Sequence, residues 1–291
     1  MNWYNILGNL YYYSVQKYAR SVGATFLYLP TDTIIRKNLA KKFKSFKKLN
    51  QGSLSILKSK PELQELYRSS NVTNSTVSNI YNIEYSENKL NTCNYKFLNA
   101  LLLENGFSKI VGMPCENLQG KKILDVGAGS GELESFLLSK GCNPKDITTT
   151  DVSEKSCKKI SALGISTLVG RLENLNFSEN YFDVIFLSYF IDYDVDQVST
   201  FLTTSKILKS DGKIIFEGLL PCQPVLKIEQ DKNKFITKGK SLLDDIKNIV
   251  NFFKQNAEGI YIQGMYLGSR FIHNRNGIVK LNSCFLVFIK K

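Results

Sequence analysis

Residues Lys122–Glu134 read K-I-L-D-V-G-A-G-S-G-E-L-E. The stretch opens with a short apolar run, Ile123–Val126, of the kind found in strands that are buried on both faces. Three glycines follow at alternate positions: Gly127, Gly129 and Gly131. The apolar residues after Gly131 recur at helical spacing. A strand, a glycine turn and a helix bring the backbone close to a bound nucleotide, because glycine lacks a Cβ and readily adopts positive φ.

An acidic residue supports this interpretation. Asp151 follows the run Ile147–Thr150, at a position where the two hydroxyls of a ribose would find an acceptor. The G-x-G-x-G spacing differs from the G-x-G-x-x-G of dinucleotide sites. With Asp125 before the turn, the segment resembles motif I of the class I S-adenosylmethionine-dependent methyltransferases. The resemblance extends over roughly residues 120–291 and implies S-adenosylmethionine (S-adenosyl-L-methionine) as the cofactor.

The chain after the glycine turn alternates between expected strands and expected helices. Such alternation predicts an α/β fold with a doubly wound, mostly parallel sheet and right-handed crossovers. The expected strands are residues 122–128, 147–152, 166–171, 182–190, 213–218, 260–272 and 277–289. The last two are joined by only four residues, 273–276, and the Asn276-Gly277 pair at this junction is a strong hairpin signal. We therefore predict a Rossmann-like, seven-stranded sheet that ends in an antiparallel hairpin.

Two regions are expected. Residues 1–85 form a basic, mainly helical N-terminal extension or lid, and residues 86–291 form the Rossmann-like domain. The extension holds 12 Lys and Arg against 4 Asp and Glu, so most of the +12 net charge lies there. The polar segment 69–79 is a linker by composition. A helix over residues 87–105 resembles the one that precedes the first strand in these methyltransferases.

Residues 34–49 are predicted to form a basic amphipathic helix. Its apolar face consists of Ile35, Leu39, Phe43 and Phe46, and seven Lys and Arg residues fill much of the remainder. One interpretation packs this helix on the core as part of the lid, with its lysines in solvent. The other places it against a nucleic acid or a membrane surface.

Composition narrows the class of protein. The apolar runs are far shorter than the roughly 20 residues that span a bilayer, and the first fifteen residues lack a signal-peptide pattern. The six cysteines are scattered, without a C-x-x-C pair. Reduced thiols in a cytoplasmic protein are therefore expected, and no metal site is expected.

The resemblance implies a donor site at the carboxyl ends of the first four strands. The glycine turn would contact the methionine part, Asp125 would order the turn or bond the ammonium group, and Asp151 would accept the ribose hydroxyls. Leu172 or Glu173 would contact the adenine. The expected cofactor-binding residues are Asp125, Gly127, Ala128, Gly129, Gly131, Asp151, Val152, Leu172, Glu173, Ser188 and Tyr189. Arg171 stands where the family often has an aspartate that binds the adenine amine, so adenine recognition must differ here.

Other motifs give weaker signals. Cys222 follows Pro221 as in cytosine C5 enzymes, but it lies after the fifth strand and not the fourth, which argues against a nucleophile. The alternating Asp192, Asp194 and Asp196 lack the glycine and the glutamate of a calcium loop. His273 is expected in or beside the hairpin turn. No general base is evident, and Asp192, Glu217 or a tyrosine remains a candidate.

Three functions stay open at this point. The first is an S-adenosylmethionine-dependent methyltransferase whose acceptor is a small molecule, which we favour. The second is a methyltransferase acting on RNA or a membrane lipid, drawn by the basic helix. The third is a non-catalytic subunit that binds S-adenosylmethionine. In-line transfer from the activated sulfonium can depend largely on proximity and orientation, so the lack of an evident base does not exclude the first.

Overall fold

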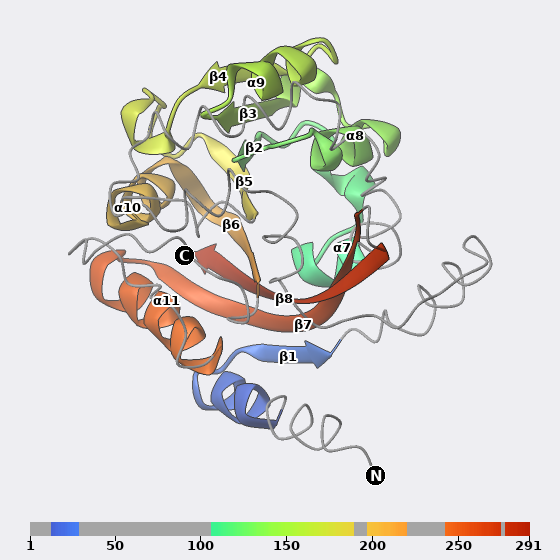
Figure 1. Cartoon of the computed structure of the whole chain (residues 1–291). Helices are drawn as coiled ribbons and strands as arrows, with labels where there is room; N and C mark the ends of the chain where they lie inside the picture. Colours follow the sequence, from blue (N-terminus) through green and yellow to red (C-terminus); the bar gives the residue numbers. More distant parts are fainter. Residues whose placement is uncertain (1–12, 29–105, 189–196, 220–241, 275–276) are drawn as a thin grey trace, which may run out of the picture.

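The computed structural model describes residues 13–28, 106–188, 197–219, 242–274 and 277–291. Strands and helices alternate along the middle of the chain, and the helices lie against both faces of one twisted sheet (Figure 1). The predicted α/β architecture is confirmed. The helix expected over residues 87–105, the linker at 69–79 and the basic helix at 34–49 lie outside the described residues.

One eight-stranded sheet forms the centre of the molecule. Its order is β1-β7-β8-β6-β5-β2-β3-β4, and only β8 runs antiparallel to its two neighbours. The strands are β1 Thr25–Tyr28, β2 Ile123–Val126, β3 Ile147–Asp151, β4 Ser166–Val169, β5 Phe182–Ser188, β6 Leu208–Leu219, β7 Ile260–Asn274 and β8 Gly277–Lys290. The order reverses between β2 and β5, because β3 and β4 extend the sheet on one side and β5 and β6 on the other. Ligands of open α/β sheets bind beside such a reversal, beyond the carboxyl ends of the strands.

The central strands are apolar because both of their faces are covered. Every residue of β2 is buried, and β5 buries five apolar side chains, three in one layer and two in the other. Short 3-10 turns occupy three of the connections: η2 Cys115–Leu118, η3 Pro144–Asp146 and η4 Leu172–Asn174.

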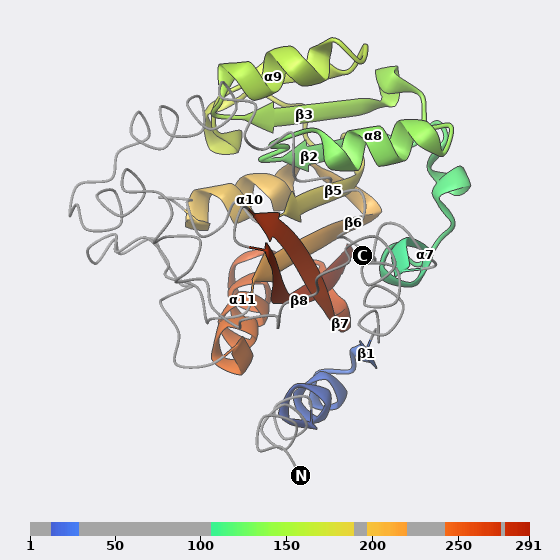
Figure 2. The same cartoon turned by 45° about the vertical axis from the view of Figure 1, so that its right-hand side comes forward.

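Two apolar layers hold the helices. On one face lie α7 Gly106–Val111, α8 Glu132–Ser139 and α9 Glu154–Ser161, which bury side chains such as Phe107, Leu137 and Ile160. On the other face lie α10 Gln197–Ile207, α11 Leu242–Asn256 and the helical residues 13–21. Figure 2 shows α8 and α9 beside the strands that follow the glycine turn.

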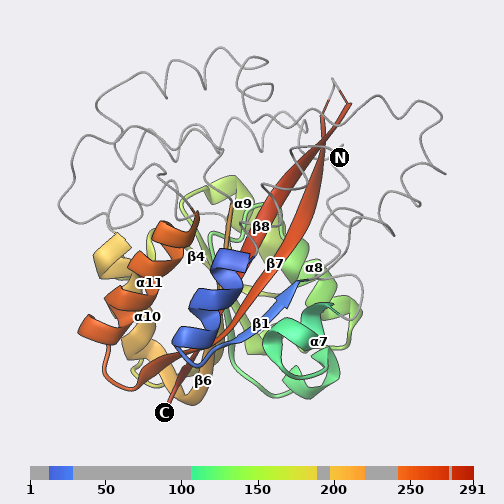
Figure 3. The same cartoon turned by 90° about the horizontal axis from the view of Figure 1, so that it is seen from below.

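The eighth strand is an addition to the predicted sheet. β1 pairs in parallel with β7 at the sheet edge, so the N-terminal region contributes a strand as well as a helix. The helical residues 13–21 lie beside α11 (Figure 3), where Lys247 Nζ is 5.8 Å from the centre of the Tyr18 ring. Val15 and Ala19 are fully buried there. The boundary expected at residues 85 and 86 stays a prediction, because it falls outside the described part.

The C-terminal hairpin is confirmed and is longer than predicted. β7 and β8 pair from Ile260↔Lys290 to Asn274↔Gly277. His273 therefore belongs to β7, one residue before its end. β6 also begins five residues before the expected strand 213–218, and it contains Asp211, which has φ 60°, at the point where the register with β5 shifts.

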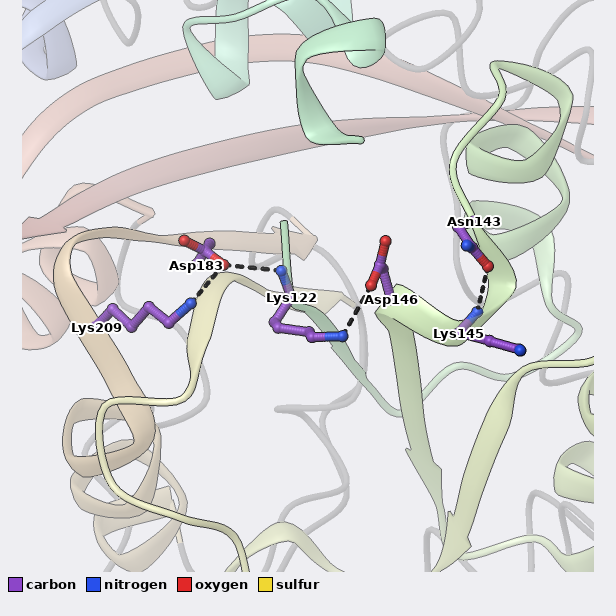
Figure 4. Close-up of polar contacts among 6 residues, drawn as sticks. All are labelled: Lys122, Asn143, Lys145, Asp146, Asp183 and Lys209. Carbon is purple, nitrogen blue, oxygen red and sulfur yellow. Dashed lines mark hydrogen bonds and ion pairs between the residues drawn. The ribbon is translucent and has the colours of Figure 1, made fainter. Parts of the chain in front are cut away.

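Charged side chains at the amino-terminal edge of the sheet are paired with one another (Figure 4). Asp183 accepts hydrogen bonds from the Lys122 amide at 2.8 Å and from Lys209 Nζ at 2.9 Å. Lys122 Nζ donates to Asp146 at 2.8 Å. The lysines beside Asp183 lower the pKa of that carboxyl even though partial burial opposes them. These contacts form an ionic network that links the starts of β2, β3, β5 and β6.

Candidate donor-binding site

The glycine turn lies at the carboxyl end of β2, beside the point where the strand order reverses. Gly127, Gly129 and Gly131 have φ of 75°, 57° and 78°, in the left-handed region that favours glycine. Gly131 is the N-cap of α8, and a Cβ added to it would lie 3.0 Å from Ile160 Cγ1. The glycine pattern is therefore required by the backbone itself.

The amides of the turn are engaged within the fold. Gly127 and Ala128 both donate to the carbonyl of Thr150 on β3, at 2.8 and 3.2 Å. The Gly131 amide donates to the carbonyl of Ala128 at 3.1 Å. These bonds hold the turn against the end of β3, so that a ligand would meet its small, Cβ-free surface.

Asp151 links the turn to the next helix. Its Oδ2 accepts from the Gly129 amide and its Oδ1 accepts from the Ser153 amide, each at 2.8 Å. The residue is only 7% exposed, and burial raises the pKa of this carboxyl. The Ser156 hydroxyl also lies within hydrogen-bonding reach of this carboxyl. An ionised carboxylate offers about four acceptor positions, so at least one remains for a ligand.

Two serines complete this junction. Ser153 caps α9 by accepting from the Ser156 amide at 3.2 Å, as Ser at this position before a helix predicts. The Ser156 hydroxyl donates to the carbonyl of Gly129. Ser156 was not among the expected site residues, although its position three residues after the cap places it next to the turn. Val152 lies between Asp151 and the cap, half-buried.

A pair of carboxyl groups lies beneath the turn. Asp125 of β2 is 3% exposed and Glu134 of α8 is fully buried, and the two side chains are within hydrogen-bonding reach of each other. Among the described residues, Asp125 Oδ1 and both Glu134 oxygens have no other partner. Burial raises the pKa of Asp125 to about 7. Burial and the Asp125 charge raise the pKa of Glu134 well above its ordinary value.

This arrangement implies a shared proton. Two ionised carboxylates in contact repel each other at low dielectric, whereas one proton between them satisfies both. Glu134 is fully buried and Asp125 is 3% exposed, so the proton is placed on Glu134, which donates to Asp125. Sequence reasoning missed Glu134. The available signal was an acidic residue at the helical spacing of the apolar face that includes Leu137.

Comparison with known proteins agrees with this geometry. Residues 124–216 match the family model described as "Methyltransferase domain". The match covers about a third of the chain and includes the glycine turn and Asp151. The resemblance inferred from Lys122–Glu134 is thereby confirmed. A search of curated proteins found none that matches the chain.

Solved structures with a similar fold share little sequence with the chain. The [4+2]-cyclase SpnF aligns with a TM-score of 0.50 at 11% identity, over 76% of this chain and 97% of SpnF. An S-adenosylmethionine-dependent methyltransferase from Methanosarcina mazei aligns at 0.44 and 17% identity, over 58% and 92%. The YcgJ protein from Bacillus subtilis gives 0.42 and 14%, over 59% and 92%.

Arg171, the expected departure, lies just after β4 and directly before η4. Its Nε donates to the carboxylate of Glu173, which also accepts from Thr200 Oγ1 of α10 at 3.2 Å. Leu172 is a core residue with 2% exposure. Glu173 is thus held by two side chains, Arg171 and Thr200, and the expected contacts of Leu172 and Glu173 with adenine stay predictions.

The acceptor side of the methyltransferase domain is described in part. Ser188 ends β5 and pairs in register with Glu217 of β6. Glu217 is 4% exposed and lies near enough to Asp125 to raise its pKa. Tyr189 and Asp192, expected near the acceptor, and Cys222 lie outside the described residues, so their predicted roles stay predictions.

Metal-ligating and thiol side chains are dispersed over the described part of the chain. Within these ranges, no three His, Cys, Asp or Glu side chains are grouped as ligands for a metal ion. Cys115, Cys142, Cys157 and Cys284 are free and buried. Over the same ranges, no helix has the length and apolar character to span a membrane.

Proposed function

We propose that the chain binds S-adenosylmethionine at the glycine turn and transfers its methyl group to a small-molecule acceptor. The main support for this donor is the hydrogen bond that links the glycine turn to Asp151. The Asp151 carboxylate accepts from the Gly129 amide at 2.8 Å and stays beside the carboxyl end of β2. The methyltransferase domain matched over residues 124–216 supports the same donor.

The electrostatics favour a cationic donor. At the amino-terminal edge of the sheet, the described carboxylates of Asp146 and Asp183 bond to lysines. At the carboxyl edge, Asp125 and Glu134 face each other and feel the charge of Asp151. Buried negative potential of this kind attracts a ligand that carries positive charge. S-adenosylmethionine carries two such charges, at the sulfonium and at the α-ammonium.

The same electrostatics favour a small acceptor over a polyanion. Glu217 adds a buried carboxyl at the end of β6, on the side of the reversal that faces away from β3. An RNA acceptor would bring phosphates toward this acidic edge, at a cost in free energy. A small molecule avoids that cost.

The experiment is an assay of S-adenosylhomocysteine formation. The whole chain is incubated with S-adenosylmethionine and, in separate reactions, a small-metabolite extract, total RNA and anionic lipid vesicles. We expect formation with the metabolite extract alone. Formation with RNA or vesicles, lost at high salt and on neutralising Lys41, Lys42, Lys44, Lys47 and Lys48, would replace the small molecule with that acceptor. Donor binding without formation in any reaction would support the non-catalytic subunit, or a reaction other than methyl transfer.

A further inference from the structure

Glu134 has no role in the proposed chemistry so far, yet its position is costly. A fully buried carboxyl with no partner other than a second carboxyl loses the hydration of its charged form. An apolar side chain at this helix position would pack beside Leu137 without that cost. A function that requires a carboxyl beside Asp125 would account for it.

Within the described part of the chain, the neighbours of the pair are acidic or neutral. Asp125 feels the charges of Asp151 on β3 and Glu217 on β6, and Glu134 feels those of Asp125 and Asp151. Thr149 of β3 is buried with an unpartnered hydroxyl oxygen. No cation among the described residues contacts the pair, so within that part of the chain a proton is what neutralises it.

We propose that Glu134 is a positioning residue for the donor: in the free protein it carries a proton that it donates in a hydrogen bond to Asp125, and it releases this proton when a ligand's ammonium group arrives. The proposal rests on the proposed function, because it assumes a donor with an α-ammonium at the glycine turn. Glu134 itself does not touch the ligand. It acts through Asp125, which lies one residue before the end of β2, next to the turn.

The exchange balances in atoms and charge. In the free protein, the O–H of Glu134 donates to the Asp125 carboxylate, and the pair carries a single negative charge. When the ammonium approaches Asp125, its positive charge replaces the proton as the neutralising group. The proton leaves Glu134 for the solvent, and the ligand keeps all its own protons. Ligand binding and proton release are then linked.

The position of Glu134 suits both of its protonation states. Its Oε2 lies 3.9 Å from the position that a Cβ on Gly131 would take. Glu134 is in the first turn of α8, where the helix dipole favours a negative charge. The site therefore tolerates the ionised form once a cation is bound, and the protonated form before that.

Titration calorimetry of the whole chain tests the proposal. S-adenosylhomocysteine, which has the ammonium group, is titrated at pH 6.5 and 7.5 in phosphate and in a buffer of high ionisation enthalpy. We expect a proton release that approaches roughly one per ligand. 5′-Methylthioadenosine is the matched probe, because it keeps the adenosine and the thioether and lacks the amino acid. We expect no release with it.

The probes separate the possible sources. Release caused by Asp151 would occur with both probes, since both carry the ribose. If part of the free ligand has a neutral amine, that part takes up a proton on binding, which is opposite in sign to the expected release. Binding of S-adenosylhomocysteine without proton release would overturn the role of Glu134 and leave the proposed function intact. No binding of either probe would overturn the proposed function itself.

A conservative variant gives a second readout. In wild type, affinity for S-adenosylhomocysteine should rise up to about tenfold per pH unit through the titration of the pair. Glu134→Gln keeps a hydrogen-bond donor to Asp125 and cannot release a proton, so its affinity should be flat over the same range. Equal slopes in the two proteins would contradict the proposal. The wild-type probe comparison stands even if the variant fails to fold.

Discussion

At the scale of single residues, carboxyl groups distinguish the two edges of the sheet. Asp183 accepts hydrogen bonds from a backbone amide and a lysine at the amino edge. Asp151 accepts two backbone amides at the carboxyl edge and has no lysine among the bonds described for it. The first is a structural contact, and the second leaves acceptor capacity for a ligand. Asp183 is therefore a matched control for substitution of Asp151.

Asp151→Ala should weaken binding of S-adenosylhomocysteine by about 1–3 kcal/mol, the typical effect of removing charge-assisted hydrogen bonds. It should also lower stability, because the amides of Gly129 and Ser153 lose their acceptor. Asp183→Ala should lower stability with no effect on binding. Calorimetric titration and urea denaturation of both variants measure this, and equal losses of affinity would show that Asp151 has no direct part in binding.

Glu134→Gln should change how stability depends on pH. A carboxyl whose pKa is raised on folding stabilises the folded state at low pH. That contribution is lost as the pH rises from the pKa of the unfolded state through that of the folded state. For Asp125 and Glu134, this window runs from acid to about pH 7 and above. Between pH 5.5 and 8, wild type should therefore lose stability relative to the variant, by about 1.4 kcal/mol per pH unit at most.

Urea denaturation at the two pH values checks the change. Glu258→Gln is the control, because Glu258 is exposed. A difference between wild type and Glu134→Gln that stays constant with pH would show that Glu134 does not titrate in this range.

At the scale of elements, the join between β2 and α8 depends on a left-handed backbone. The glycine pattern made this join predictable, together with Asp151 and the Ser153 cap, because each follows from local geometry. Glu134 was not predictable, because nothing in a single helix tells that its carboxyl will lie under the preceding turn. The hydrogen bonds from Arg171 and Thr200 to Glu173 were not predictable either, because they join residues from different elements.

Gly131→Ala should lower stability by about 1–2 kcal/mol from the left-handed backbone alone, with a further loss from contact with Ile160. Gly120→Ala is the matched control, since Gly120 has φ 74° and a Cβ added to it would have no atom within 4 Å. Only Gly131→Ala should also weaken donor binding. Equal losses in denaturation midpoint and unchanged binding would contradict a role of the turn in the site.

At the scale of the whole molecule, the N-terminal region is part of the fold. The parallel order and the closing hairpin were predictable from alternation and from Asn276-Gly277. Strand β1 was not, because Thr25–Tyr28 is short and pairs with β7, more than 200 residues along the chain; Thr25 Oγ1 donates to the Gln263 carbonyl at 3.1 Å across a separation of 238 residues. Such a long-range partner leaves no periodic pattern in the sequence.

Ala19→Asp should therefore destabilise the whole molecule by about 3 kcal/mol or more, because it places an unpaired charge in the layer shared with α11. Arg20→Asp changes the neighbouring exposed residue and should have a far smaller effect. Thermal unfolding of both variants makes the comparison. Equal melting temperatures would mean that residues 13–21 do not belong to the cooperative fold.

The central claim is that the glycine turn and Asp151 form a donor site. Equilibrium dialysis of radiolabelled S-adenosylmethionine against the whole chain tests it most directly. We expect saturable binding at a single site that S-adenosylhomocysteine displaces. Binding should be retained in Asp183→Ala and weakened in Asp151→Ala. Absence of saturable binding to the folded wild-type chain would contradict it.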